Sequence, residues 1–272
     1  MSHVRVLDLG ELGFRLGFVR LDELRPHEEI IPAELSSLVR SMESDGFQSD
    51  PLMVDGVTLT VLDGAHRLAA LGELGARWAV AALVDYEDSR IAVARWLRSM
   101  DPRSASGAAT GVGMAQVGDW RIAVEAVDSS RGRVAVLMPS GPSYLSQALG
   151  GCVEAHRLAR TVWSRVPAGE ASLIPDDRVG AALESGAALV YPPAPLKEEV
   201  IISAASGDLF PPKSTRHIFH ARPLGIDVPL EVLRSSEPDL DIIRGRISMP
   251  RVLPPNSEFR GRRYEDRVVL FK

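Results

Sequence analysis

The sequence predicts an α/β protein of two domains, and three observations lead to this prediction. Short apolar runs of strand composition alternate with amphipathic segments of helical period over residues 1–100. A stretch rich in Ser, Gly and Ala follows at 101–113 without any periodicity, as in a boundary or a loop. The chain of 272 residues is long enough for two domains of common size. We therefore expect one domain over residues 1–100 and another over residues 101–272.

The first domain should contain a regular alternation of strands and helices. In chain order we expect a strand at 14–21, a polar turn at 22–29, a helix at 32–45, short strands at 51–54 and 57–62, a helix around 68–74 and a strand at 78–84. The first helix is predicted because apolar residues recur at i, i+3, i+4 and i+7, with Pro32 near its start and Gly46 after its end. The two short strands flank Asp55-Gly56, a dipeptide typical of hairpin turns.

The second domain is less regular in its sequence signals. We expect strands at 120–127 and 133–138, helices at 152–166 and 196–206, and a closing strand at 267–271. The segment 210–222 stands apart because it holds one of the chain's three lysines, two arginines, two histidines and two hydroxyl side chains behind a stiff Pro-Pro pair. This concentration of polar donors indicates a candidate ligand-binding segment.

Composition and charge exclude several classes of protein. The formal net charge is −5, and residues 1–100 hold 10 arginines, no lysine and 16 acidic residues, a formal charge of −6. An acidic region of this kind is unsuited to binding nucleic acid, which depends on Lys and Arg at the phosphates. Cys152 is the single cysteine, and no apolar run approaches the ~20 residues of a membrane span. We expect a cytoplasmic protein with no nucleic-acid or membrane partner.

The sharpest local motif is the turn Asp63-Gly64-Ala65-His66-Arg67, in which a strand runs into Asp-Gly and a helix begins at once. The first backbone N–H groups of a helix have no partner within the helix, and the helix dipole attracts anions there. His66 and Arg67 would then hold a phosphate that binds at this turn. The alternative is that Asp63 caps the helix while His66 and Arg67 are only solvated.

Two further segments are candidates for the same site. Glu28, in the turn Pro26-His27-Glu28-Glu29, could take a proton from a hydroxyl nucleophile if it faced a phosphate site. The alternative is a glutamate that only keeps a loop hydrated. In Thr215-Arg216-His217, the arginine fork suits a carboxylate or phosphate, and its alternative is a basic surface turn.

The order of these motifs resembles the N-terminal domain of the ParB/sulfiredoxin superfamily. The shared order is strand, proline turn, helix, Asp50-Pro51-Leu52-Met53-Val54, strand, Asp63-Gly64-Ala65-His66-Arg67, helix. In sulfiredoxin a catalytic cysteine precedes the His-Arg pair, and here Ala65 has that place. In chromosome-partitioning ParB proteins the turn reads Gly-Glu-Arg-Arg and a basic helix-turn-helix follows, and this chain has neither.

The chain is similar over nearly its whole length to the free L-serine kinases of this superfamily, the SerK/SbnI type. The motifs that carry the resemblance are the Leu-Asp-Gly-Ala-His-Arg turn, Pro26-His27-Glu28, Trp96, the segment 210–217, Val228-Pro229-Leu230 and the strand at 265–271. The resemblance implies a ParB/sulfiredoxin-like N-terminal domain, a C-terminal α/β domain and an active-site cleft between the domains. It also implies phosphoryl transfer from ATP or ADP to free L-serine, giving O-phospho-L-serine.

The resemblance further implies a role for each candidate residue. The nucleotide phosphates would rest on Gly64, Ala65, His66 and Arg67, with His66 and Arg67 countering the charge of the transferred group. Glu28 would accept the proton of the serine hydroxyl, and Asp63 would orient that hydroxyl or help to hold Mg²⁺. The residues expected to bind the amino acid are Trp96, Thr215, Arg216 and His217.

Two other functions stay open at this point. One is a ParB-like regulator that binds a nucleotide without kinase activity. The other is a kinase for a related hydroxy amino acid such as threonine or homoserine, because one methyl or methylene group changes pocket affinity only modestly. The sequence does not distinguish ATP from ADP as donor, and it does not indicate the oligomeric state.

Overall fold

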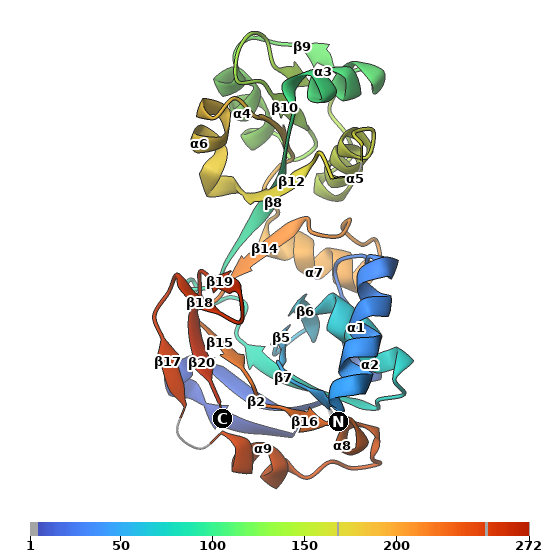
Figure 1. Cartoon of the computed structure of the whole chain (residues 1–272), viewed down its shortest axis with the longest axis vertical. Coiled ribbons are helices and arrows are strands. Elements are labelled where there is room, and N and C mark those ends of the chain that lie inside the picture. Colours follow the sequence, from blue (N-terminus) through green and yellow to red (C-terminus); the bar gives the residue numbers. More distant parts are fainter. Residues whose placement is uncertain (1–4, 168, 248–249, 272) are drawn as a thin grey trace. The chain divides into compact units, whose positions relative to one another are not determined.

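The computed structural model describes residues 5–167, 169–247 and 250–271 (Figure 1). Contacts divide these residues into two units, and the chain passes between them four times. Unit 1 comprises the residues up to Ala92, residues 204–207 and the residues from His217 on, and unit 2 comprises Val93–Ser203 and Asp208–Arg216. This division differs from the contiguous boundary near residue 100 that the sequence predicted, because the C-terminal segment packs with the N-terminal one.

A six-stranded sheet forms the centre of unit 1. Its strands, in spatial order, are β1 (Arg5–Leu9), β2 (Phe14–Arg20), β7 (Trp78–Val84), β5 (Leu52–Asp55), β6 (Thr60–Asp63) and β3 (Arg25–Pro26). Every residue of β7 is buried, which explains why this central strand is a continuous apolar run in the sequence. The predicted strands at 14–21, 51–54, 57–62 and 78–84 are thus all present.

Two helices of unit 1 contact each other, α1 (Pro32–Asp45) and α2 (Ala65–Glu73). As predicted, α1 has Pro32 in its first turn and ends at Gly46, whose φ of 78° is left-handed. Leu35 and Met42 on this helix are buried. Helix α2 follows directly on β6, so the Asp63–Arg67 motif lies at the strand-to-helix turn where the sequence placed it.

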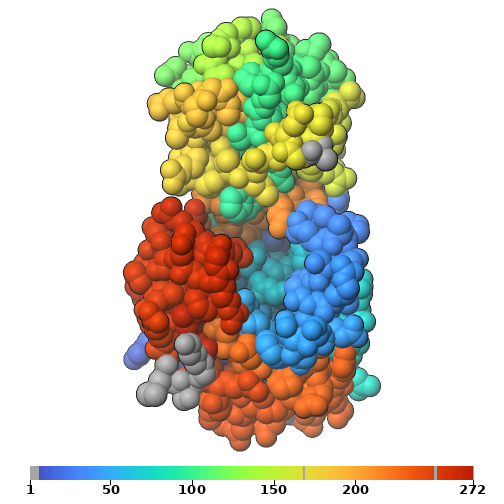
Figure 2. Space-filling model, viewed as in Figure 1, coloured from blue at the N-terminus to red at the C-terminus, as the bar shows by residue number. Residues whose placement is uncertain are grey.

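The C-terminal part of unit 1 adds small sheets and two short helices. These elements are β15 (Ala221–Leu224), β16 (Val228–Pro229), α8 (Leu230–Arg234), α9 (Leu240–Arg246), β17 (Arg251–Leu253), β18 (Ser257–Phe259), β19 (Arg262–Tyr264) and β20 (Arg267–Leu270). Strand β16 pairs with β4 (Phe47–Gln48), and the backbone N–H of Ile226 donates to the carbonyl of Ser49 at 2.8 Å. Figure 2 shows the C-terminal residues, in red, and α1, in blue, on the same face of unit 1.

Unit 2 is built around a second sheet. Its strands run in the order β12 (Ser172–Pro175), β8 (Ala92–Met100), β13 (Ala188–Tyr191), β10 (Ala135–Leu137), β11 (Tyr144–Leu145) and β9 (Ala115–Gln116), and β14 (Thr215–Ile218) also pairs with β8. The helices that follow in the chain are α3 (Pro102–Gly111), α4 (Trp120–Asp128), α5 (Cys152–Trp163), α6 (Val179–Glu184) and α7 (Lys197–Ser206). Short 3₁₀ turns occur in unit 1 at Gly10–Leu12 and Leu21–Glu23 and in unit 2 at Asp176–Arg178. The predictions for 133–138, 152–166, 196–206 and 267–271 are confirmed, as β10, α5, α7 and β20.

The prediction of a loop or boundary at 101–113 was wrong, because this stretch forms α3. The carboxylate of Asp101 accepts hydrogen bonds from the backbone N–H groups of Arg103 and Ser104 and so caps the helix. The small side chains that suggested a linker are packed instead, and Ala105 and Ala109 are fully buried.

The predicted strand at 120–127 was also wrong, because it is helix α4. Asp119 caps this helix by accepting from the backbone N–H of Arg121 at 3.0 Å. Ala123 and Val127, four positions apart, are its buried residues. The segment therefore has helical period as well as the apolar alternation that favoured a strand. None of the helices in the described part of the chain has the length and apolar character needed to cross a bilayer.

Candidate active site

The turn between β6 and α2 has a backbone that requires glycine. Gly64 has a φ of 107°, and a Cβ at this position would lie 2.6 Å from Leu52 Cδ2 and 3.1 Å from Arg67 Nη2. Among the described residues no side chain caps the start of α2. The alternative interpretation, in which Asp63 caps the helix, is therefore wrong, and the N-terminal turn of α2 presents its N–H groups without a side-chain acceptor.

Asp63 contacts two arginines through a single oxygen. Its Oδ2 accepts from Arg67 Nη2 at 3.0 Å and from Arg222 Nη1 at 2.5 Å. Burial alone would raise the pKa of the Asp63 carboxyl, but the charges of Arg222, Arg67 and Arg262 outweigh it and hold this pKa well below its usual range. Asp63 is therefore a carboxylate at neutral pH.

Arg67 is largely engaged in this structure. Its Nη1 donates to the backbone carbonyls of Asp50 at 3.0 Å and Pro51 at 2.5 Å, besides the contact of Nη2 with Asp63. These contacts occupy three of the five N–H donors of a guanidinium. Arg67 thus fixes the loop before β5 to the Asp63–Arg67 turn. Only its remaining N–H donors can contact the phosphate that the sequence predicted it to bind.

His66 connects the turn to the segment before α1. The backbone N–H of Ile31 donates to His66 Nε2 at 2.8 Å, and the same nitrogen lies 3.6 Å from Glu34 Oε2. Because a backbone N–H can only donate, Nε2 accepts and the ring proton lies on Nδ1. His66 Nε2 therefore holds Ile31 in place.

The segment that carries Glu28 is fixed beside the same turn. Strand β3 pairs in parallel with β6, with Pro26 opposite Val61, and His27 Nδ1 donates to the carbonyl of Val61 at 2.7 Å. Beyond Glu28, Ile31 is held by His66. The backbone on both sides of Glu28 is thus tied to the strand and helix that flank the Asp63–Arg67 turn, and the two predicted segments lie next to each other within unit 1.

His217, predicted to contact the amino acid, lies in unit 1 against the Glu28 segment. Its Nε2 is 2.8 Å from the hydroxyl of Tyr86, and its ring meets the ring of His27 edge to face with centroids 5.4 Å apart. The ring of Phe219 stacks on the ring of His217, with centroids 5.9 Å apart. All four side chains are buried. Sequence reasoning missed Tyr86, which follows β7 in a turn and has no motif of its own.

The other predicted substrate residues lie together in unit 2. The backbone N–H of Trp96 donates to the carbonyl of Ser214 at 3.1 Å, and the guanidinium of Arg216 is 5.8 Å from the Trp96 ring centroid. Arg216 Nη2 donates to Asp176 Oδ1 at 2.7 Å. Thr215 is buried next to Arg216. From the sequence, Arg216 was expected to pair with a substrate carboxylate. In the structure Arg216 already pairs with the carboxylate of Asp176.

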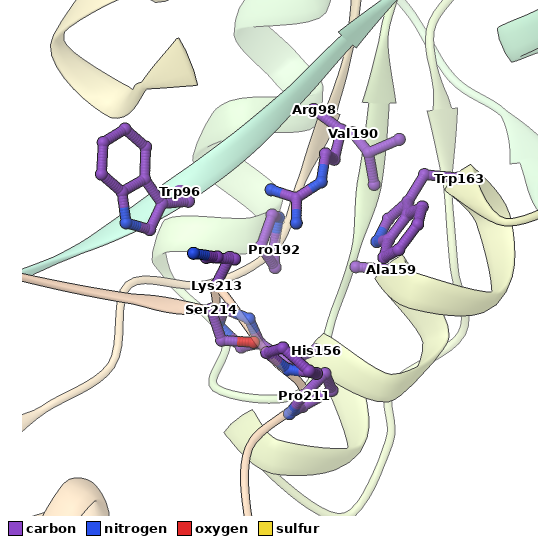
Figure 3. A pocket seen from close by; sticks show the side chains of 11 residues that line it. Trp96, Arg98, His156, Ala159, Trp163, Val190, Pro192, Pro211, Lys213 and Ser214 are labelled. Carbon is purple, nitrogen blue, oxygen red and sulfur yellow. The ribbon is translucent and has the colours of Figure 1, made fainter. Parts of the chain in front are cut away.

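A pocket in unit 2 adjoins this group (Figure 3). Its lining includes Trp96, Arg98, His156, Trp163, and the turn from Pro211 to Ser214. The guanidinium of Arg98 lies 4.9 Å from the Trp163 ring centroid. Burial lowers the pKa of His156 to about 4, so this imidazole is neutral at pH 7 and its Nε2–H donates to the carbonyl of Pro193 at 3.0 Å. The pocket combines aromatic walls with the cationic side chains of Arg98 and Lys213.

Two functional candidates come from the C-terminal segment and were missed by the motif analysis. Arg222 Nε donates to Asp266 Oδ2 at 2.6 Å while its Nη1 contacts Asp63. Arg222 lies in the cationic segment 210–222 that the sequence singled out, so its composition was a partial signal. Asp266 lies 203 residues beyond Asp63 in the chain; it falls in the strand at 265–271 that the resemblance includes, but no role was predicted for this residue from the sequence.

The residues at the turn fit a magnesium ion held mainly by a nucleotide. Asp63 Oδ1 accepts no hydrogen bond from the described part of the chain, whereas Oδ2 accepts two. The described residues contain no cluster of three or more His, Cys, Asp or Glu side chains that could enclose a metal. Mg²⁺ bound with a nucleotide commonly uses one or two carboxylates, phosphate oxygens and water. Asp63 Oδ1 is the protein oxygen that suits such an ion.

Known proteins similar to this chain include two L-serine kinases. The ADP-dependent L-serine kinase SerK of Thermococcus kodakarensis is 27% identical over 227 residues, which cover 79% of this chain and 92% of that kinase. The ATP-dependent L-serine kinase of Staphylothermus marinus is 26% identical over 230 residues, or 79% of this chain and 90% of that kinase. No protein-family model matches the chain.

Solved structures give the same result for the fold. A free serine kinase in complex with AMP matches with a TM-score of 0.66 and 26% identity, covering 79% of this chain and 92% of that one. SbnI from Staphylococcus aureus, with a C-terminal truncation, matches with a TM-score of 0.66 at 18% identity, covering 85% and 93%, and at this identity shows the fold alone. The chain is therefore a homologue of the free L-serine kinases and has their ParB-like fold, as the order of its motifs predicted.

Proposed function

We propose that this protein is a kinase that transfers the terminal phosphoryl group of ATP or ADP to the hydroxyl of free L-serine, giving O-phospho-L-serine. The observation that carries the proposal is the pairing of two segments in unit 1. The Glu28 segment is tied through His27 to Val61 and through Ile31 to His66, directly beside a helix N-terminus suited to phosphate. Similar proteins include an ADP-dependent and an ATP-dependent L-serine kinase, which supports the proposal.

The nucleotide would bind with its phosphates at the start of α2. No side chain of the described residues caps the start of α2, and the positive end of the helix dipole adds to the attraction of this turn for an anion. His66 and the remaining N–H donors of Arg67 would contact the terminal phosphate. These groups are positioned before the reaction, so they stabilise charge on the transferred group without further rearrangement.

Glu28 is proposed as the general base. As the serine Oγ forms its bond to phosphorus, its proton passes to the Glu28 carboxylate, and the bond between phosphorus and the bridging oxygen of the donor breaks. The leaving nucleotide is ADP from ATP, or AMP from ADP. Because catalysis of phosphoryl transfer is chiefly positioning and electrostatic stabilisation, the two tethers of the Glu28 segment matter as much as its carboxylate.

Asp63 would contribute through its Oδ1. This oxygen would orient the serine hydroxyl or hold a magnesium ion, and such an ion, when bound, would neutralise part of the phosphate charge. Oδ2 has a separate role because it keeps the guanidinium groups of Arg67 and Arg222 in place.

The amino acid is proposed to bind to Trp96, Thr215, Arg216 and His217. His217 is held by the Tyr86 hydroxyl and the edge of His27, so its ring cannot rotate without losing both contacts. Asp176 balances the charge of Arg216, and a substrate carboxylate would therefore share this guanidinium with Asp176. The polar partners are of the type that a small zwitterion requires.

A matrix of donors and acceptors tests the proposed function. Purified protein with Mg²⁺ would be combined with ATP or ADP and with serine, threonine or homoserine, and products would be followed by phosphorus NMR. We expect O-phosphoserine from at least one donor, at a rate well above those of the other two amino acids. No phosphorylated serine with either donor would contradict the kinase, and nucleotide binding without amino-acid-dependent turnover would favour a regulator. If threonine or homoserine were phosphorylated faster than serine, that amino acid would replace serine as the proposed substrate.

A further inference from the structure

Arg222 has a buried guanidinium that joins two carboxylates. It lies on β15, and 8% of its side chain is exposed. Nη1 donates to Asp63 Oδ2 at 2.5 Å and Nε donates to Asp266 Oδ2 at 2.6 Å. The other oxygen of Asp266 accepts from the backbone N–H of Phe219 at 2.7 Å. Strand β15 pairs in parallel with β20, which begins directly after Asp266, so the sheet fixes the two partners in register.

A requirement for stability alone does not explain these buried ion pairs of Arg222 with Asp63 and Asp266. Buried ion pairs often stabilise a fold no better than apolar residues of similar volume. The charges at this place therefore suggest a function beyond holding β15 in unit 1.

The geometry indicates what that function is. Arg67, four residues after Asp63 on the adjoining helix, already pairs with Asp63 Oδ2. Arg222 adds a contact to the same oxygen from a strand 159 residues away in the sequence. Two guanidinium groups on one oxygen restrain rotation of the carboxylate and leave Oδ1 to face a ligand.

We propose that Arg222 is a positioning residue of the kinase site, which orients Asp63 by binding its Oδ2, while Asp266 holds Arg222. The inference rests on the proposed function, because it assigns Arg222 a role in the same reaction. Arg222 itself touches neither substrate nor nucleotide in this account. Its contribution is to the rate of transfer and not to the affinity for the nucleotide, since the phosphate-binding N–H groups belong to α2.

Substitutions of Arg222 should therefore separate turnover from nucleotide binding. A small misplacement of a reacting group can lower a rate by about 100-fold. We expect Arg222→Lys, which keeps the charge but lacks the rigid planar set of donors, to lower kcat roughly 10-fold, and Arg222→Gln to lower it roughly 100-fold. The dissociation constant for ADP, measured by calorimetry, should stay within about 3-fold in both. Arg90→Gln, which breaks an exposed Arg–Asp pair of unit 1, is the matched control and should leave kcat unchanged.

A double-mutant cycle with Asp63→Asn tests whether Arg222 acts through Asp63. In that background, Arg222→Lys should lower kcat by less than about 3-fold, since the carboxylate to be oriented is absent. If Asp63→Asn is too slow to measure, the graded loss from Arg to Lys to Gln at constant ADP affinity decides the matter. Should Arg222→Gln fail to fold, the double variant Arg222→Gln with Asp266→Asn takes its place in the experiment, because it removes both charges of the buried Arg222–Asp266 pair.

The outcomes distinguish this inference from the proposed function. An inactive wild-type protein would contradict the kinase itself. An active wild type whose Arg222→Lys and Arg222→Gln variants keep kcat within about 2-fold would overturn the positioning role alone. A loss of ADP affinity and thermal stability in parallel with kcat would also overturn it, because a purely structural role predicts that pattern.

Discussion

The candidate residues of the two units are held in place by different means. In unit 1, Asp63, His66 and Arg67 lie within five positions of one another, and a strand pairing and two hydrogen bonds attach the Glu28 segment to them. In unit 2, Arg216 is held by Asp176, 40 residues earlier, and Asp176 Oδ2 also lies 3.8 Å from Arg95 Nε.

This difference predicts that substitutions in the two groups of residues affect different steps of the reaction. The unit 1 turn is a backbone feature, because a helix N-terminus and a left-handed glycine shape it. The unit 2 group depends on a balance of charges between a buried arginine, Arg216, and a partly buried carboxylate, Asp176. Changes at the unit 1 turn should therefore mainly affect phosphate binding and turnover, and changes in the Arg216 group of unit 2 should mainly affect affinity for the amino acid.

The largest effect is expected from Glu28→Gln. Loss of a general base typically lowers a rate by about 100-fold to 10,000-fold, because the hydroxyl proton then has no acceptor in place. The variant should bind ADP as the wild type does, since the α2 amides are unchanged. Steady-state kinetics with serine gives kcat, and calorimetry gives the affinity.

Glu29→Gln is the matched control for the same prediction. It removes a carboxylate from the adjacent position and should keep kcat within about 3-fold. A kcat of Glu28→Gln close to the wild-type value would show that Glu28 is not the general base. The remaining role of unit 1 would then be to bind the nucleotide phosphates.

Substitution of Gly64 tests the backbone character of unit 1. Gly64→Ala places a Cβ 2.6 Å from Leu52 Cδ2 at a φ of 107°. We expect the free energy of unfolding to fall by about 3 kcal/mol, from left-handed strain and a core clash together, and the affinity for ADP to fall as well. Chemical denaturation and calorimetry measure the two effects.

Gly180→Ala supplies the comparison for Gly64. Gly180 is the second residue of α6, and a Cβ there meets nothing within 4 Å. Alanine in place of this glycine should stabilise by no more than about 1 kcal/mol. Equal effects of the two substitutions would show that the turn at Gly64 tolerates a side chain, against the close approach seen in the structure.

Acid should destabilise unit 2 through His156. Burial lowers the pKa of this residue to about 4 in the folded state, whereas the unfolded value is 6.5. Stability from the neutral ring is full above pH 6.5 and is lost as the pH falls toward 4, by at most about 3 kcal/mol. The unfolding free energy of His156→Asn should fall less steeply over this range, and an identical pH profile for both proteins would contradict the prediction.

The fold of the N-terminal part of unit 1 could be predicted because its signals are local, whereas the packing of the C-terminal segment against it could not. Pro32 and Gly46 delimit α1, and Asp63-Gly64 marks the turn into α2. Helices α3 and α4 were missed because the residues that define them, the capping Asp101 and Asp119 and small buried alanines, also occur in loops and strands. The pairs Arg222 with Asp63 and Arg216 with Asp176 could not be predicted, because only tertiary structure brings their charges together.

The smallest expected effect is the one that tests unit 2 most directly. Asp176→Asn removes the charge that holds Arg216 over Trp96 but keeps the shape of the side chain. We expect the KM for serine to rise about 10-fold, equal to a loss of about 1.4 kcal/mol, with kcat and the affinity for ADP little changed. Asp177→Asn, at the adjacent position, should leave the KM unchanged. If Asp176→Asn instead lowered the KM for serine, Asp176 would be competing with the substrate carboxylate for Arg216, and this guanidinium would be a carboxylate site restrained by its own partner.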